Sequence, residues 1–127
     1  MKRIFSCLLL LLITISFAVT AQSDFQNPSI VDDAGYLMQS ELSSLSKELD
    51  EVREKYGFEV AIYTESDMTS STAEASADDI YDYNGYGAGE NDDGILLYIC
   101  SDTREYHFTT HGKGLKYFNS NGLAYLE

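Results

Sequence analysis

One apolar run in the second half of the chain constrains the fold more than any other feature. Residues 95–100 read Ile-Leu-Leu-Tyr-Ile-Cys, with a glycine-rich and acidic segment before them and Ser101 and Asp102 after them. A short apolar run between turn signals is typical of a β-strand that is buried on both faces. The rest of the chain is therefore expected to supply a covering layer for each face of this strand.

Upstream of this strand, the pattern predicts a short extended piece at 30–35, a helix, a strand and a second helix. Ser40 is the expected cap of the first helix, which ends at Gly57. Residues 58–64 are mostly β-branched or aromatic, which favours a strand, and Thr72 is the expected cap of a helix that extends to residue 83. The first helix has one apolar stripe, formed by Leu42, Leu45, Leu49, Val52 and Tyr56.

Downstream, residues 101–104 are expected to form a tight turn, and residues 105–111 alternate as in an antiparallel strand. Apolar positions after a Gly-Lys-Gly break at 112–114 predict a further helical segment up to Leu126. Because a helix connects the strands at 58–64 and 95–100, these strands should be parallel with a right-handed crossover. The predicted fold class is α/β, a three-layer αβα sandwich around a small mixed sheet.

The N-terminus has the features of a secretory signal peptide. Lys2 and Arg3 precede an apolar core, and small residues at 19–21 form a cleavage site. The alternative is an uncleaved membrane anchor, although the apolar run is shorter than the ~20 residues of a membrane span. The predicted organisation is a signal peptide at 1–21, a mobile leader at 22–29 and one domain at 30–127. Cleavage would leave Cys100 as the one cysteine, so no intramolecular disulfide is expected.

The charge of the chain limits the functions that it can have. Without residues 1–21, six basic residues face 21 acidic ones, which gives a net charge of −15. Such a charge repels nucleic acids and anionic membrane surfaces and attracts cations. We therefore exclude nucleic-acid binding.

The glycine-rich turn at 85–89 does not have the pattern of a nucleotide site. A dinucleotide-binding loop follows a strand and opens a helix, whereas this turn follows the predicted helix and precedes the strand. No helix N-terminus would then point at a phosphate. Gly85 and Gly87 are instead expected to supply left-handed residues at the end of a helix.

Acidic residues gather in the predicted turns, and two interpretations stay open for them. Oxygen ligands from irregular loops suit hard cations, Ca²⁺ in particular. The alternative is that each carboxylate accepts hydrogen bonds from backbone amides of its own turn. A hydrolase with a carboxylate-bound metal, and with Arg104 on a phosphate, is the enzymatic possibility. The residues concerned are Asp32, Asp33, Glu90, Asn91, Asp92, Asp93 and Asp102.

Several short motifs follow one another in order from residue 30 to the end of the chain. They are VDDAGYL at 31–37, YG at 56–57, ADD at 77–79, GYG at 85–87, DDGILL at 92–97, DTR at 102–104 and GKG at 112–114. In these residues the chain resembles the TPM domain family. Its members include a thylakoid-lumen protein, a photosystem II repair protein, an animal acetylcholine-receptor auxiliary subunit and YgcG-like secreted proteins of bacteria.

The resemblance implies an αβα sandwich outside the cytoplasm and a divalent-cation site, with Ca²⁺ as the expected ion. The acidic loop positions that match are Asp33, Asp92, Asp93 and Asp102. Arg104 and the glycines Gly85, Gly87 and Gly94 also stand at matching positions. Acid phosphatase activity is attributed to plant members of the family.

We therefore expect a secreted or extracytoplasmic domain that binds a divalent cation. It would act as a non-catalytic or assembly-assisting module of the cell envelope, with a membrane or envelope protein as partner. A metal-assisted acid phosphatase and a purely structural module are the alternatives. Members of the family usually continue further past the Gly-Lys-Gly position, so the domain is expected to be C-terminally truncated. Membrane anchoring would then depend on an uncleaved signal or on a missing C-terminal segment.

Overall fold

The computed structural model describes residues 27–124. The elements in chain order are β1 (Ile30–Asp32), α2 (Gln39–Tyr56), β2 (Glu59–Glu65), α3 (Ala73–Asn84), the 3₁₀ turn η1 (Gly89–Asn91), β3 (Gly94–Cys100), β4 (Glu105–His111), α4 (Gly114–Tyr117) and α5 (Ser120–Leu123). Within the described residues, no helix is both long enough and apolar enough to cross a membrane.

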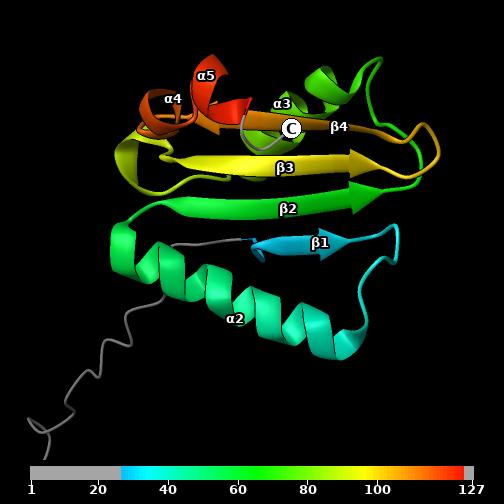
Figure 1. The fold of residues 1–127 in the computed structure, drawn as a ribbon, viewed down its shortest axis with the longest axis horizontal. Coiled ribbons are helices and arrows are strands. Elements are labelled where there is room, and N and C mark those ends of the chain that lie inside the picture. Colours follow the sequence, from blue (N-terminus) through cyan, green and yellow to red (C-terminus); the bar gives the residue numbers. More distant parts are fainter. Residues whose placement is uncertain (1–26, 125–127) are drawn as a thin grey trace, which may run out of the picture.

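Four strands form one mixed sheet in the order β1-β2-β3-β4 (Figure 1). β1 pairs with β2 and β2 pairs with β3 in parallel, and β4 returns antiparallel to β3. The parallel pairing of β2 and β3 through α3 confirms the predicted crossover, because α3 carries the chain back to the end of the sheet where β2 began. The antiparallel strand predicted at 105–111 is also confirmed.

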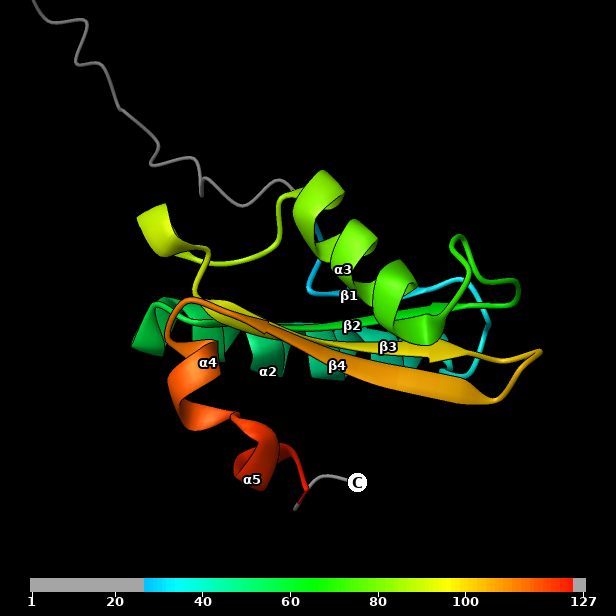
Figure 2. The same cartoon turned by 90° about the horizontal axis from the view of Figure 1, so that it is seen from above.

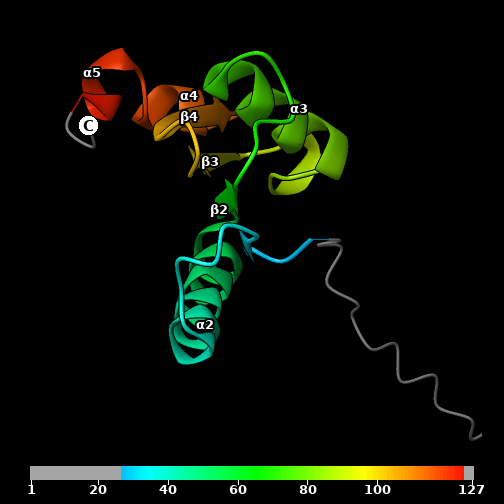
Figure 3. The same cartoon turned by 90° about the vertical axis from the view of Figure 1, so that its right-hand side faces the viewer.

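Helices cover both faces of the sheet, but over different strands. α3 packs against β3 and β4 on one face, whereas α2 packs mainly against β2 and β1 on the other. α4 contacts β4 from the same side as α2, and α5 follows it there (Figure 2 and Figure 3). This arrangement confirms the three-layer αβα sandwich.

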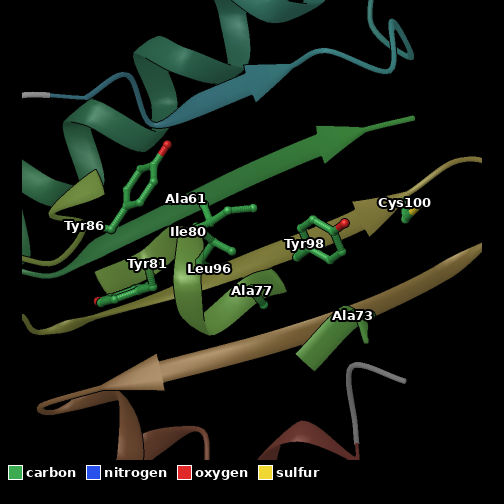
Figure 4. Close-up of a cluster of buried hydrophobic side chains, with 9 residues drawn as sticks. All are labelled: Ala61, Ala73, Ala77, Ile80, Tyr81, Tyr86, Leu96, Tyr98 and Cys100. Atoms are coloured by element: carbon green, nitrogen blue, oxygen red, sulfur yellow. The ribbon is translucent and has the colours of Figure 1, made fainter. Parts of the chain in front are cut away.

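The best-packed part of the described chain lies between α3 and the sheet (Figure 4). Leu96, Tyr98 and Cys100 point from β3 toward α3, and all three are 0% exposed. The Tyr98 hydroxyl donates to Glu65 Oε1 (2.6 Å), which gives each of these buried polar groups a partner. Cys100 is a free cysteine that packs here as a small apolar residue.

The opposite face of β3 is less covered than the sequence predicts. Leu97 and Ile99 are only partly buried, because α2 packs mainly against β2 and β1. Together with Tyr106 and Phe108 of β4, they line an open hollow of about 380 Å³. The prediction that residues 95–100 are buried on both faces is therefore correct for the α3 face, whereas on the other face Ile95 alone is buried.

α2 begins earlier than a cap at Ser40 implies. Its first residue is Gln39, and Met38 stands at the N-cap position. The Glu41 carboxylate accepts the N–H of Met38 (2.9 Å), which satisfies one of the free donors at the helix start. Ser40 therefore lies inside the first turn, and the side chain that caps the helix is the glutamate.

α3 has the boundaries that its cap predicts. The Thr72 hydroxyl accepts the N–H of Ala75 (3.1 Å). Gly85 follows the helix in the left-handed conformation, with a φ of 70°, and its N–H donates to the Tyr81 carbonyl. The helix therefore ends where the glycine-rich turn begins, as predicted.

The two ends of the domain differ from the predictions. Ser29, which the sequence assigns to a mobile leader, is buried, and its carbonyl accepts the N–H of Ile62 (2.8 Å). The single helical segment predicted after residue 114 is two short helices, α4 and α5. The signal peptide, the leader up to residue 26, and Tyr125 and Leu126 lie outside the described residues, so those predictions stay predictions.

A buried ion pair joins α2 to the start of β2. β2 starts at Glu59, one residue later than predicted, and Glu59 is only 3% exposed. Arg53 Nη1 donates to Glu59 Oε1 (2.9 Å), and Arg53 Nη2 donates to Asp50 Oδ1 (2.6 Å). A buried carboxylate has lost its hydration and depends on such partners. The pair therefore fixes the last turns of α2 against the sheet.

Removing the arginine from this pair should destabilise the domain strongly. In Arg53→Ala, Glu59 stays buried without the guanidinium group, and we expect the free energy of unfolding to fall by about 3–5 kcal/mol. Urea unfolding followed by circular dichroism measures the loss. The matched control is Lys47→Ala, since Lys47 makes an exposed pair with Glu51 (3.6 Å) and its loss should cost less than about 1 kcal/mol. Equal losses in both variants would contradict this assignment.

Candidate functional site

The loop between α3 and β3 is tightened by a glycine. Gly87 has a φ of 106°, and a Cβ atom there would lie 2.6 Å from the backbone of Asp92. Ala88 and Asp93 close the loop through two backbone hydrogen bonds of 3.0 and 2.9 Å. The single turn η1 between them leaves Asp92 in the left-handed conformation, with a φ of 50° and its side chain exposed. The loop therefore places the side chains of Glu90 and Asp92 outward and that of Asp93 inward.

Buried polar contacts fix this loop to the sheet and to α3. Glu59 Oε2 accepts the N–H of Gly87 (2.6 Å), and the Tyr81 hydroxyl donates to the carbonyl of Asp92 (2.8 Å). Gly94 starts β3 beneath Tyr81, where a Cβ atom would lie 2.9 Å from the Glu59 carbonyl oxygen. Gly87 and Gly94 therefore have packing roles that explain their place in the motifs.

Asp93, a predicted metal ligand, clamps the turn between β4 and α4. Its Oδ1 accepts the N–H of Lys113 (2.8 Å), and its Oδ2 lies 2.8 Å from Lys113 Nζ. The Lys113 hydrogen bonds lower the pKa of Asp93, and the Asp93 hydrogen bond and charge raise the pKa of Lys113. Asp93 is 5% exposed. The two motifs that contain these residues, DDGILL and GKG, are therefore joined by one carboxylate.

Beside this clamp lies a polar hollow of about 320 Å³. It is lined by Tyr81, Asp82, Gly85, Tyr86 and Asp92. His111 stacks on the Tyr81 ring with a centroid distance of 4.2 Å, and its Nε2 lies 3.8 Å from Asp82 Oδ1. The hollow thus lies between the end of α3 and the glycine loop, and His111 at the end of β4 contacts two of its lining residues.

Four carboxylates surround the Tyr81 hydroxyl. Burial first, and then the charges of Glu59, Asp92, Asp93 and Asp82, raise the pKa of Tyr81 well above its ordinary value. Arg53 balances Glu59 and Lys113 balances Asp93. The carboxylates of Asp82 and Asp92 have no lysine or arginine partner in the described part of the chain. Uncompensated negative charge therefore collects at this hollow.

The other two predicted metal ligands lie at the opposite end of the sheet. Asp33 follows β1 and Asp102 follows β3, so both stand at the carboxyl ends of parallel strands. The seven residues of β3 separate this end from Asp92 and Asp93 by roughly 20 Å. The structure therefore does not bring the four predicted ligands together, and one ion cannot contact all of them.

At the carboxyl end, the neighbouring acid Asp32 has a turn role. Thr64 Oγ1 donates to Asp32 Oδ1 (2.6 Å), and the N–H of Leu37 donates to Asp32 Oδ2 (2.8 Å). The Thr64 hydrogen bond is the largest cause of the lowered pKa of Asp32. Arg104 stands in the same end of the molecule with a φ of 58° and is exposed. The described ion pairs do not include one between Arg104 and Asp102.

Two residues at this site have no role in the sequence-based prediction. Asp82, which lines the hollow, lies in the predicted second helix, and His111, which stacks on Tyr81, lies in the predicted strand at 105–111. Asp82 precedes the glycine turn by less than one helical turn, which is the one signal that could have placed it at the loop. Across residues 27–124, no three His, Cys, Asp or Glu side chains lie close enough together to hold a metal ion by themselves.

The contact of Asp93 with Lys113 should make stability depend on pH at both ends of the range. The lowered pKa of Asp93 contributes stability above its ordinary value of 3.8, and this is lost as the pH falls through the lowered pKa. The raised pKa of Lys113 contributes stability below its ordinary value of 10.5, and this is lost as the pH rises through the raised pKa. We expect Asp93→Asn to unfold at lower urea than the unchanged chain at neutral pH, and the difference to shrink below pH 3.8.

Asp33→Asn is the control for this pH profile. It removes an exposed carboxylate from the far end of the sheet and should change the free energy of unfolding by less than about 0.5 kcal/mol. A difference between Asp93→Asn and the unchanged chain that is the same at every pH would show that the carboxylate charge is not what holds the turn.

Comparisons with known proteins agree with this architecture. The solution NMR structure of the N-terminal domain of a protein from P. gingivalis is similar, with a TM-score of 0.68 and 22% sequence identity. The match covers 78% of this chain and 63% of that one, so this chain spans less than two thirds of that structure. This likeness shows a shared fold. Among curated proteins, the search finds no match. The family model described as the TPM domain matches residues 30–126, and the chain therefore belongs to the TPM domain family.

Proposed function

We propose that this TPM domain is a non-catalytic module of the cell envelope that binds a divalent cation, Ca²⁺ being the expected ion. The proposed site is the hollow beside Tyr81, where Asp82 and Asp92 present carboxylates. Two carboxylates, backbone oxygens and water form an ordinary ligand set for a hard divalent cation. The observation that carries the proposal is that arginine and lysine balance only Glu59 and Asp93 among the four carboxylates around Tyr81.

The chemistry of the side chains at the hollow favours binding over catalysis. The Tyr81 hydroxyl donates a hydrogen bond to the Asp92 carbonyl, and the raised pKa of Tyr81 keeps the hydroxyl protonated at neutral pH. The lining residues include neither a serine nor a cysteine. Arg104, which a phosphatase would use to steady a phosphate, stands at the other end of β3.

The envelope location rests on the N-terminal pattern. A chain that begins with a signal peptide would act outside the cytoplasm, where free Ca²⁺ is available to a weak site. A membrane or envelope protein is then the expected partner. In this proposal the cation stiffens the loop between α3 and β3, and the module takes part in assembly without turning over a substrate.

Calcium should stabilise the chain, and the response should depend on the hollow. A cation at about 100 times its Kd adds about 2.7 kcal/mol to the free energy of unfolding. We expect the melting temperature of chelator-treated protein to rise with CaCl₂, and the rise to be absent in the double variant Asp82→Asn/Asp92→Asn. Differential scanning fluorimetry and calorimetric titration of CaCl₂ measure the response.

The matched control is Asp33→Asn/Asp102→Asn, which removes two exposed carboxylates from the opposite end of the sheet. This variant should keep the calcium response. If it alone loses the response, the cation binds at the carboxyl end and the proposed location is wrong. If no cation changes the melting temperature of the unchanged chain or of either double variant, cation binding is rejected and the purely structural module is favoured.

The same variants test the phosphatase alternative. Hydrolysis of p-nitrophenyl phosphate is measured with CaCl₂ or MgCl₂ and with chelator. We expect no turnover above the uncatalysed rate. Metal-dependent turnover that is lost in Asp82→Asn/Asp92→Asn or in Asp33→Asn/Asp102→Asn would replace the non-catalytic proposal with a metal-assisted phosphatase.

A further inference from the structure

The outer edge of β4 offers unpaired backbone groups along a whole strand. β4 is the last strand in the sheet order, and its seven residues pair with β3 without a bulge. Every second residue of an edge strand points its N–H and C=O away from the sheet. Within the part of the chain that the structure describes, no segment hydrogen-bonds to these outward groups. Figure 2 looks onto this edge, with α3 on one side of it and α4 and α5 on the other.

The usual protections of an edge strand are missing from β4. Exposed edges are normally kept short, or carry proline, lysine or a bulge, because they would otherwise pair with another chain. The opposite edge, β1, follows this rule with only three residues. The sequence of β4, EYHFTTH, contains neither proline nor lysine. The negative charges near this edge are Glu105 at its start and the carboxylates of the helix beside it.

α3 places a row of carboxylates along β4. Thr109 Oγ1 donates to Asp78 Oδ1 (2.5 Å), and His111 Nε2 lies 3.8 Å from Asp82 Oδ1. Glu74, one turn before Asp78, continues the same row and is exposed. The helix contains no lysine or arginine. A segment that adds to this edge would meet negative charge from α3 along its length.

The spacing of this row matches an extended chain. Residues four apart on a helix are about 6 Å apart along its axis, and residues two apart on a strand are about 6.7 Å apart. Lysine or arginine at every second position of an added strand would therefore meet successive carboxylates. A second copy of this chain would instead bring its own acidic α3 to the same edge, which like-charge repulsion opposes.

The other face of the edge is mainly apolar, with Arg104 and Glu105 at the turn between β3 and β4. Tyr106 and Phe108 point away from α3, and with Leu97 and Ile99 they line the open hollow of about 380 Å³. Tyr106 is 48% exposed, and its ring meets that of Phe108 edge-on at 6.1 Å. Because side chains alternate along a strand, the residues between the basic positions of an added strand would face this hollow. Apolar side chains suit them.

We propose that the β4 edge binds an extended segment of a partner protein in which lysine or arginine alternates with apolar residues. Backbone hydrogen bonds to β4 would give affinity, and the two faces would give specificity. The basic side chains meet Glu74, Asp78 and Asp82, and the apolar side chains meet Tyr106 and Phe108. The proposal shares Asp82 with the proposed cation site, but Glu74 and Asp78 do not line the hollow beside Tyr81, so substitutions at those two residues test it separately.

A synthetic peptide tests this proposal directly. The full chain, labelled with ¹⁵N and kept in chelator, is titrated with the acetylated and amidated peptide KVKFKVK. We expect shifts in the amide signals of residues 105–111 and slower hydrogen exchange at the outward amides of β4. Two further peptides carry methyl groups on the backbone nitrogens, one on the odd-numbered residues and one on the even-numbered residues. Only one of these two sets of N–H groups can face β4, so only the peptide methylated on that set should lose binding.

The charge row is tested with a pair of matched double variants. Glu74→Gln/Asp78→Asn should weaken binding of the labelled peptide by about fivefold in fluorescence anisotropy, as expected for two exposed ion pairs. Glu48→Gln/Glu54→Gln removes the same charge from the exposed side of α2 and should change the affinity by less than about twofold. Both variants keep carbonyl oxygens at the substituted positions, so the Thr109 contact can persist.

Several outcomes would overturn the proposal. Equal binding of the non-alternating peptide KKKFVVK, or of the acidic peptide EVEFEVE, would remove the requirement for alternating basic residues. Equal loss of peptide affinity in the two double variants would show that the peptide responds to the net charge of the protein and not to the carboxylates of α3. Peptide-induced shifts confined to elements other than β4 would show that the peptide does not bind at this edge. A dimer of the free chain joined through β4 would show that the edge pairs with a second copy instead.

Discussion

The buried carboxylate of Glu59 is the interaction on which the amino end of the sheet depends. One oxygen accepts from Arg53 of α2 and the other from the N–H of Gly87 in the loop after α3. Its own N–H donates to the Asp93 carbonyl (3.0 Å). A helix on one face, a strand, and a loop from the other face therefore meet at one residue. Since a buried charge is stable only with its partners in place, the positions of these three elements are coupled.

The offset between the two covering helices explains the surfaces that remain open. α3 lies over β3 and β4, and α2 lies over β1 and β2. Each helix completes the core for one half of the sheet, so the best-packed region is the α3 side of β3. The α2 side of β3 and β4 keeps partly exposed aliphatic and aromatic side chains. The open apolar face and the unpaired edge of β4 therefore adjoin each other, which is why one extended partner can contact both.

Some acidic residues of the motifs hold turns through hydrogen bonds, and others present an exposed charge. Asp32 orders the turn before α2, and Asp93 holds the turn after β4. Asp32 agrees with the interpretation that acids in turns accept amides of their own turn, whereas Asp93 accepts an amide from another turn, 20 residues further along the chain. Asp92, next to Asp93 in the sequence, points outward because its left-handed backbone reverses the chain. Asp82 joins it from α3. A motif can therefore predict where acids gather, but neighbouring acids can have opposite roles.

The local pattern of the sequence determined the elements and their order. The spacing of apolar residues, the Thr72 cap and the glycines after each helix predicted α2, α3 and the strands, because these signals act over a few residues. The βαβ order then determined the parallel pairing and the layers. The tertiary structure alone decided that Asp33 lies at the same end of the sheet as Asp102, that Arg53 reaches Glu59, and that Asp82 joins the loop. These contacts depend on register and helix offset, which set the direction of each side chain and are not encoded in the spacing of any one segment.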